Sequence, residues 1–176
     1  YLNKLRLKNT LKVVGGKTRK ESTFNALKKI KKMNCNKILI HDAARPNTSK
    51  KVIKQIIRKL KKNHAVIPII KINDATKRAN ENTIFKNIQR NSLRFAQTPQ
   101  GFTYKKIYEK HKENENLFFD DDSAFFTEVG EKVVAINGSK TNLKITDKED
   151  LDILKSLKRG ETYTGIGFDV HRLVKK

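Results

Sequence analysis

The first half of the chain alternates between short apolar runs and stretches in which apolar residues recur every three or four positions. Residues 13–16 (VVGG) are typical of a strand that ends in a turn, and Phe24, Leu27 and Ile30 follow at helical spacing. A second strand is predicted over Lys37–His41. The remaining elements predicted in this half are a helix capped by Thr48 or Ser49, with an apolar face at Val52, Ile53, Ile56, Ile57 and Leu60, and a buried strand over Ala65–Ile72.

The polar segment Asp74–Arg94 departs from this rhythm. It holds two roughly alternating stretches on either side of residues 80–82, which predict a two-stranded arm. Such an arm cannot bury a core by itself, so we expect it to pack on a partner chain, with a solvated loop as the alternative. Beyond the arm, the pattern predicts helices over Tyr104–His111 and Asp121–Val129, the second ending at Gly130, and a strand over Lys132–Ile136.

The next predicted helix begins at a capping box, in which Thr146 is followed three residues later by Glu149. Its apolar face comprises Leu151, Leu154 and Leu157, and it ends at Gly160. A new strand is then predicted over Gly165–His171. We therefore expect a first domain over residues 1–159, a link over 160–164, and the start of a second domain over 165–176.

This alternation of strands and helices, with nearly continuous apolar strands, predicts an α/β fold with a mainly parallel, Rossmann-like sheet. Ligands of such sheets bind beyond the carboxyl ends of the strands. Polar residues that follow directly on a strand are therefore the first candidates for chemistry.

Composition narrows the class of protein. The 176 residues, 36% of them hydrophobic, fit one cytosolic domain or a large piece of one. No run approaches the roughly 18 apolar residues that a membrane helix needs, and no secretory signal is evident, so we expect a cytoplasmic protein that does not bind membranes. Cys35 is the single cysteine and has no Cys or nearby His partner, which predicts an inert thiol.

The net charge of +22 raises the possibility of nucleic-acid binding, because clustered basic residues release counterions from phosphates. However, 31 of the 40 basic residues are Lys, and they are spread through nearly every segment. Arg clusters that read bases and aromatic residues that stack on them are missing. The distribution is typical of solvated faces, so nucleic acid is not predicted as a partner.

Asp42 and Arg45 follow directly on a predicted strand, at the edge of the sheet where ligands bind. Asp42 can hold Mg²⁺ through a hard oxygen ligand, and the planar guanidinium of Arg45 fits phosphate oxygens. In the structural alternative, Asp42 caps the following turn and forms an ion pair with Arg45. Lys144 stands alone among apolar neighbours, where it can face a phosphate as a point charge or extend to water.

Acidic residues provide two further candidates. Asp120, Asp121 and Asp122 precede a predicted helix, where carboxylates complement the helix dipole, and a metal cluster is the other interpretation. Asp169 and His171 lie two residues apart on a predicted strand, so they share a face, and both residue types bind Zn²⁺. The sequence offers no third ligand, so a strand-end pair without a metal stays open.

Seven strings in this sequence resemble, in the same order, motifs of the 2-C-methyl-D-erythritol 4-phosphate cytidylyltransferases of the non-mevalonate isoprenoid pathway. They are GGKTRKES (15–22), HDAARP (41–46), DATKRA (74–79), QRN (89–91), TPQGF (98–102), DDSA (121–124) and NLKIT (142–146). The resemblance extends to about Arg159. Residues 165–173 (GIGFDVHRL) resemble the opening of 2-C-methyl-D-erythritol 2,4-cyclodiphosphate synthase, a later enzyme that is fused to the first in some bacteria.

The resemblance implies a nucleotidyltransferase sheet with a protruding β-arm over about 74–95, and Mg²⁺-dependent transfer of CMP from CTP to 2-C-methyl-D-erythritol 4-phosphate. Arg90 would bind the substrate phosphate in the partner subunit's site, which implies a homodimer. The nucleotide contacts implied are Gly16 and Ser22 at the cytosine, and Asp42, Ala43 and Arg45, with Asp42 beside the Mg²⁺. The substrate-phosphate contacts implied are Arg90, Thr76, Asp120 and Lys144, with Lys144 at the reacting centre. In the synthase part, Asp169 and His171 would hold Zn²⁺ or a similar divalent ion.

The sequence departs from the family pattern at three points. The Gly-rich nucleotide loop and the first strand of the family would precede Tyr1, so we expect a fragment, truncated at both ends and inactive alone. Ala75 stands where the family has Thr in its arm motif, with Thr76 next to it, and Asp120 stands where the family has another Thr.

Two alternative functions follow from the sequence. A cytidylyltransferase for another sugar-alcohol phosphate, such as ribitol 5-phosphate, shares the fold and several motifs. The GIGFDVH string argues against it, because a synthase of the isoprenoid pathway has no reason to follow a ribitol enzyme. The other alternative is a basic nucleic-acid-binding module.

Overall fold

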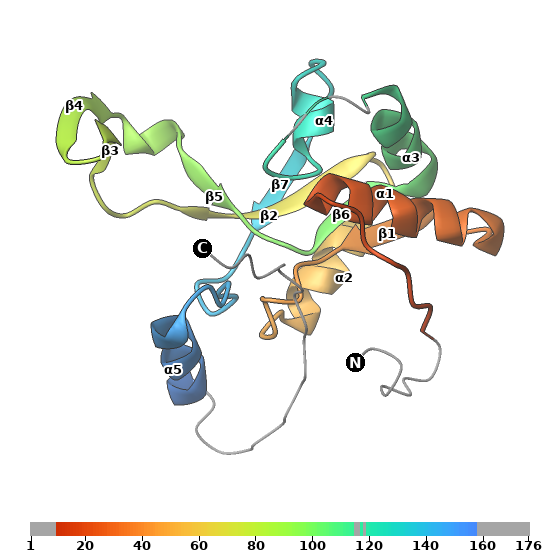
Figure 1. Cartoon of the computed structure of the whole chain (residues 1–176), viewed down its shortest axis with the longest axis horizontal. Helices are drawn as coiled ribbons and strands as arrows, with labels where there is room; N and C mark the ends of the chain where they lie inside the picture. Colours follow the sequence, from red (N-terminus) through yellow and green to blue (C-terminus); the bar gives the residue numbers. More distant parts are fainter. Residues whose placement is uncertain (1–9, 115–116, 118, 158–176) are drawn as a thin grey trace.

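Helices pack on both faces of a five-stranded sheet, and a two-stranded arm projects from it (Figure 1). This computed structural model describes residues 10–114, 117 and 119–157. The helices are α1 (Arg19–Ile30), α2 (Lys50–Lys59), α3 (Tyr104–Glu113), α4 (Ala124–Thr127) and α5 (Lys148–Leu157), with single 3₁₀ turns at η2 (Lys31–Met33) and η3 (Arg90–Ser92). The strands are β1 (Lys37–Ile40), β2 (Ala65–Lys71), β3 (Thr76–Asn80), β4 (Thr83–Ile88), β5 (Arg94–Ala96), β6 (Gln100–Thr103) and β7 (Val134–Asn137).

The sheet is mostly antiparallel, so the prediction of a mainly parallel sheet was wrong. Strand β6 lies between β1 and β2 and runs antiparallel to both. Strand β5 continues along the same edge of β2, also antiparallel, while β7 pairs in parallel with the other edge. The sequence pattern missed β5 and β6 because they are short and flank the dipeptide Thr98-Pro99, next to a glycine.

The direction of the strands nevertheless preserves the predicted ligand edge. Because β6 reverses the chain between β1 and β2, the strands β1, β2 and β7 all run the same way. Their carboxyl ends therefore meet at one edge of the sheet. The loops that leave β1 and β7, at residues 41–49 and 138–147, start from this edge.

Two clusters of buried side chains form the core, one on each face of the sheet. Neighbouring residues Ala65 and Val66 of β2 belong to different clusters, as the alternation of a strand requires. The first cluster joins Ala65 to Leu27, Phe102, Ile107, Phe125 and Phe126, and the second joins Val66 to Val52, Ile56, Leu60 and Ile136. On the second face, α2 lies so close to β6 that a Cβ atom at Gly101 would stand 2.2 Å from a methyl carbon of Ile56.

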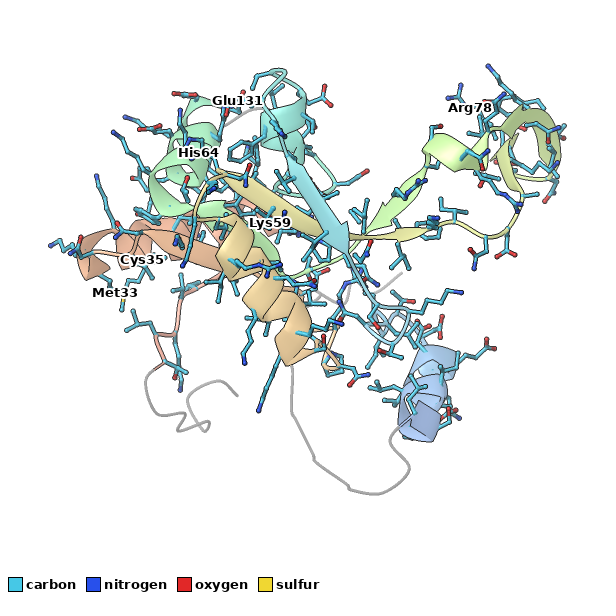
Figure 2. The ribbon with its side chains drawn as sticks, turned by 180° about the vertical axis from the view of Figure 1, so that it is seen from behind. Met33, Cys35, Lys59, His64, Arg78 and Glu131 are labelled. Atoms are coloured by element: carbon cyan, nitrogen blue, oxygen red, sulfur yellow. The ribbon has the colours of Figure 1, made fainter. Side chains whose placement is uncertain are left out.

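The predicted two-stranded arm is confirmed. Strands β3 and β4 pair antiparallel from Thr76 opposite Ile88 to Asn80 opposite Thr83, with an irregularity after Arg78. Figure 2 shows Arg78 far out on the arm, away from the sheet. The large apolar side chains of Ile84 and Phe85 are 64% and 59% exposed, so the arm has no core of its own.

Most predicted helices are confirmed, and their boundaries follow from local hydrogen bonds. Ser49, and not Thr48, caps α2, because its hydroxyl accepts a hydrogen bond from the backbone N–H of Val52. The predicted helix over 121–129 is shorter, since the Asp121 carboxylate accepts hydrogen bonds from the N–H groups of Ser123 and Ala124 and so places the start of α4 later.

Two further predictions were wrong in detail. The apolar run at 13–16 is not a strand: it pairs with no described strand, and Val14 is 87% exposed. The cap of α5 lies one residue later than predicted, at Asp147 and not at Thr146, because the Asp147 carboxylate accepts a hydrogen bond from the Asp150 N–H. The carboxylate of Asp150, and not that of Glu149, accepts hydrogen bonds from the N–H and the hydroxyl of Thr146. The predicted helix end at Gly160, the link at 160–164 and the strand at 165–171 lie outside the described residues.

None of the helices within the described ranges has the length and the apolar character that a membrane span requires.

Candidate active site

The loop that follows β1 is held at the carboxyl edge of the sheet by hydrogen bonds to distant parts of the chain. The backbone N–H of Asp42 donates to the Thr98 hydroxyl, at 3.0 Å. The N–H of Ile145 donates to the carbonyl of Ala44, at 2.8 Å, which joins this loop to the segment that carries Lys144. The two strand-end clusters predicted from the sequence are therefore side by side.

Asn142 connects these two segments and is almost completely buried, at 1% exposure. Its side-chain amide donates to the Thr98 carbonyl at 2.8 Å, and its side-chain oxygen accepts from the Thr48 hydroxyl at 3.0 Å. Its backbone carbonyl accepts from Nη1 of Arg45 at 2.8 Å. Both polar groups of the side chain are satisfied, as burial demands.

Three cationic side chains surround the carboxylate of Asp42. Nε of Arg45 and Nζ of Lys144 each lie 3.7 Å from Oδ2 of Asp42, and Nε of Arg19 lies 3.9 Å from Oδ1. The predicted ion pair between Asp42 and Arg45 is thus present. Arg19 also pairs with the carboxylate of Asp122, at 2.7 Å. Three cationic side chains and two carboxylates still leave an excess of positive charge, which suits a polyphosphate ligand.

Burial lowers the pKa of Arg45, and the neighbouring Asp42 partly opposes this shift. The guanidinium is nevertheless a base strong enough to stay protonated in proteins. Its Nε is buried without a hydrogen-bond partner among the described residues, although its ion pair with Asp42 remains. Arg45 therefore keeps a positive charge that is fixed in place beside Asp42.

The loop before α1 brings Gly16 and Ser22 together. The N–H of Gly16 donates to the Ser22 hydroxyl at 3.0 Å, and that hydroxyl donates to the Thr18 carbonyl. A Cβ atom at Gly16 would stand 2.2 Å from Cβ of Glu21, so only glycine fits here. The two residues that the sequence assigned to a cytosine contact are thus neighbours.

The two arm residues among the candidates are joined to the Asp42 cluster by no described contact. Thr76 opens β3 and pairs with Ile88, and the guanidinium of Arg90 donates to the Asn73 carbonyl at the base of the arm. The chain therefore supplies its candidate site in two parts.

The three consecutive aspartates have three different environments. Asp120 is exposed, and Asp121 accepts hydrogen bonds at the start of α4 and from the Gln100 amide. Asp122 is buried and pairs with His111 and Arg19. No group of three or more His, Cys, Asp or Glu residues in the described part of the chain is arranged to hold a metal, so the metal-cluster interpretation was wrong. Asp169 and His171 lie outside the described residues.

Several residues of the site were not singled out from the sequence. Thr98 and Arg19 lie within the strings TPQGF and GGKTRKES, but neither follows a predicted strand. Gln97 has a buried amide that donates to the Ser139 carbonyl and whose oxygen accepts from the Ser139 N–H. The sequence signal for Thr98 and Arg19 is their place inside two of the motif strings, whereas Gln97 lies just outside TPQGF and carries no such signal.

Asp42 is the acidic side chain available for a metal at this cluster. Mg²⁺ is usually held by one or two carboxylates together with substrate phosphates, rather than by a cage of protein ligands. A single half-buried carboxylate surrounded by cations fits an ion that arrives with a nucleotide, and does not fit a metal retained by the protein alone.

Comparisons with known proteins identify the family of this chain. The family model for IspD, 2-C-methyl-D-erythritol 4-phosphate cytidylyltransferase, matches residues 1–158. The chain belongs to this family. A bifunctional enzyme IspD/IspF from Pelagibacter ubique is 43% identical over 174 residues, 99% of this chain and 45% of that protein. The 2-C-methyl-D-erythritol 4-phosphate cytidylyltransferase of Clostridioides difficile is 37% identical over 158 residues. The matched region is 89% of this chain and 66% of that protein.

Solved structures of IspD proteins share the fold. The Francisella tularensis enzyme superposes with a TM-score of 0.77 at 29% identity, over 89% of this chain and 76% of that one. The bifunctional IspDF from Campylobacter jejuni gives a TM-score of 0.74 at 32% identity, over 85% of this chain and 38% of that one. The sheet described above is thus part of an IspD-type α/β nucleotidyltransferase fold, and the chain spans less than half of the bifunctional relatives it matches.

Proposed function

We propose that the protein containing this chain transfers CMP from CTP to 2-C-methyl-D-erythritol 4-phosphate and releases pyrophosphate. The observation that carries the proposal is the gathering of Arg19, Arg45 and Lys144 around Asp42, at the ligand edge of an IspD-type sheet. Such a reaction depends mainly on positioning and on neutralising charge, which these side chains supply.

In the proposed reaction, an oxygen of the substrate phosphate attacks the α-phosphorus of CTP. The new P–O bond forms as the bond to the pyrophosphate oxygen breaks, and pyrophosphate leaves with the electron pair. Lys144 faces the phosphates at the reacting centre, and Arg45 and the backbone at Ala43 line the nucleotide site. The half-exposed Lys144 side chain is free to approach phosphates while it stays near Asp42.

Gly16 and Ser22 are proposed to contact the cytosine. Ser22 holds the Gly16 N–H in place, which fixes the backbone of this turn. Glu21 occupies the space of a side chain at Gly16, so glycine is required for the turn to form. Asp42 would hold Mg²⁺ together with the nucleotide. When bound, that ion neutralises part of the phosphate charge.

Arg90 and Thr76 are proposed to bind the substrate phosphate in the site of a partner subunit. Asp120, which stands where the family has Thr, carries a negative charge that repels a phosphate, so it is not proposed as a phosphate ligand. This proposal gives the arm its role: a segment with exposed apolar residues and no core would be covered by a second copy of the chain. A homodimer follows from the proposal.

We also propose that residues 1–159 form the cytidylyltransferase domain, 160–164 a link, and 165–176 the start of a cyclodiphosphate synthase domain. Support comes from relatives named bifunctional enzyme IspD/IspF, one of which aligns with 174 residues of this chain. In that domain, Asp169 and His171 would contribute to a site for Zn²⁺ or a similar ion.

The full-length protein tests the reaction directly. Pyrophosphate release from CTP is measured with 2-C-methyl-D-erythritol 4-phosphate and, separately, with ribitol 5-phosphate, each with Mg²⁺ and after chelation. Release with the first substrate alone, abolished by chelation, is the expected result. Preference for ribitol 5-phosphate would overturn the substrate assignment. A steeply salt-dependent affinity for duplex or single-stranded DNA or RNA, without pyrophosphate release, would favour the nucleic-acid-binding alternative.

A further inference from the structure

A chain of polar contacts runs from the buried interior to the carboxylate of Asp42. Nε2 of His111 lies 2.9 Å from Oδ1 of Asp122, and Nη2 of Arg19 donates to Oδ2 of Asp122 at 2.7 Å. Nε of the same guanidinium lies 3.9 Å from Oδ1 of Asp42. Arg19 thus bridges a buried carboxylate and the carboxylate at the centre of the candidate site.

The inner end of this chain is fixed by packing. His111 is fully buried, with its ring 4.6 Å from that of Phe125 and stacked 5.8 Å from that of Phe24. Asp122 is 1% exposed, so its carboxylate depends on His111 and Arg19 for hydrogen bonds. A buried charge is tolerated only when it is paired and hydrogen-bonded. Without Arg19, the buried carboxylate of Asp122 would lose a charged partner, which is unfavourable. The guanidinium of Arg19 therefore stays paired with Asp122.

The outer end has a specific geometry. The other two cations, Arg45 and Lys144, both approach Oδ2 of Asp42, whereas Arg19 approaches Oδ1. One carboxylate oxygen therefore faces the two residues proposed to act on phosphates, and the other faces the bridge. Rotation of the Asp42 carboxylate would disturb both pairings.

We propose that Arg19 is a positioning residue for Asp42, and that the buried pair Asp122 and His111 acts through Arg19. The inference deepens the cytidylyl transfer proposed above and rests on it. Asp122 sets the direction of the guanidinium, and the guanidinium sets the rotation of the Asp42 carboxylate. The three elements involved are α1, α3 and the turn before α4, which meet on one face of the sheet.

The test is a double-mutant cycle in the full-length protein, with R19A, D122N and both together. Supporting residues that act through a functional one typically change activity by about 10- to 100-fold. We expect R19A to lower kcat/KM by about this factor. Because Asp122 acts through Arg19, the double variant should be no less active than R19A alone, whereas independent structural effects would multiply.

Chemical rescue supplies a readout that a merely structural role would not move. Millimolar guanidinium chloride, far below denaturing concentrations, should restore part of the activity of R19A, since the side chain is 40% exposed and leaves an open position beside Asp122. The same salt should not restore the double variant, which has lost the carboxylate that would hold the ion. R19K keeps the charge but not the fork that reaches two carboxylates, so it should stay impaired.

D152N is the matched control, because it makes the same change in an exposed carboxylate of α5 that pairs with Lys155. Thermal midpoints are recorded for every variant. Three outcomes would each overturn the positioning role. They are full activity in R19A, multiplicative losses in the double variant, and equal rescue with and without Asp122. If D122N does not fold, R19A and its rescue still decide the question. A wild-type protein without cytidylyl transfer would instead refute the proposed function.

Discussion

The edge of the sheet at Asp42 and the arm are built in opposite ways. At the edge, buried side chains such as Gln97 and Asn142 hydrogen-bond to backbone groups more than 40 residues away in the sequence. In the arm, β3 and β4 pair only with each other, and most of their side chains are exposed. The first region is organised by the chain itself, while the second presents an unburied surface.

The difference indicates how a site can be divided. Groups that neutralise charge must be held in place before the ligand arrives, because reorganisation costs free energy at the moment of reaction. A phosphate contact brought by a second subunit needs only a stiff support of the right length. In the proposed dimer, the arm would be this support, with Arg90 at its base bonded to the Asn73 carbonyl.

The strongest test of this difference between the edge and the arm is the change of Lys144 to Ala in the full-length protein. Loss of a positive charge at the proposed reacting centre should lower turnover by at least about 100-fold, with little change in the thermal midpoint. Steady-state kinetics and calorimetry measure the two effects. Near-normal turnover would refute the role of Lys144, and K140A, a change in a neighbouring lysine outside the cluster, is the control.

A second change tests whether the edge is organised by buried hydrogen bonds. Asn142→Ala removes two side-chain bonds and leaves the carbonyl of the buried Thr98 without its partner, which should lower the free energy of unfolding by about 2 kcal/mol. Urea denaturation measures it. Asn63→Ala removes an exposed bond to the Lys59 carbonyl and should have a much smaller effect. Equal effects of the two variants would contradict the distinction.

The arm should respond in the opposite way. Phe85→Ala removes an exposed apolar side chain, so the unfolding midpoint of the monomer should not change, but the proposed dimer should weaken by about tenfold, a typical loss for an aromatic interface residue. Sedimentation equilibrium measures the dissociation constant. Val129→Ala, at a similarly exposed site outside the arm, should leave association unchanged. An unchanged dissociation constant in the Phe85 variant would show that this residue is not part of the interface.

The smallest effect is expected at an ion pair that belongs to neither region. Lys110 lowers the pKa of Glu131 mainly by hydrogen bonding, so the pair stabilises the fold above the ordinary carboxyl pKa of 4.5, and this contribution is lost as the pH falls through the lower pKa of the folded state. Glu131→Gln should slightly lower the thermal midpoint near neutral pH. The difference should vanish in acid, and a difference independent of pH would contradict the assignment.

Sequence patterns predicted the positions of most helices and strands because burial imposes a clear period on them. They failed on the sheet direction, since β5 and β6 have only three and four residues and are separated by Pro99, so they carry no such period. The meeting of Asp42 with Lys144 followed from the rule that strand ends share an edge. The bridge through Arg19 did not, because Arg19 starts a helix and Asp122 resembled one more acid before a helix.

Gly101 lies inside the sheet, yet a substitution there is expected to affect the candidate site. A side chain there would push α2 away from β6, since Ile56 and Leu60 occupy the space that its Cβ would need. Helix α2 begins two residues after Thr48, whose hydroxyl donates to the side-chain oxygen of Asn142 at the candidate site. In a genetic screen for lost activity, substitutions at this buried glycine should therefore group with substitutions at the candidate site itself.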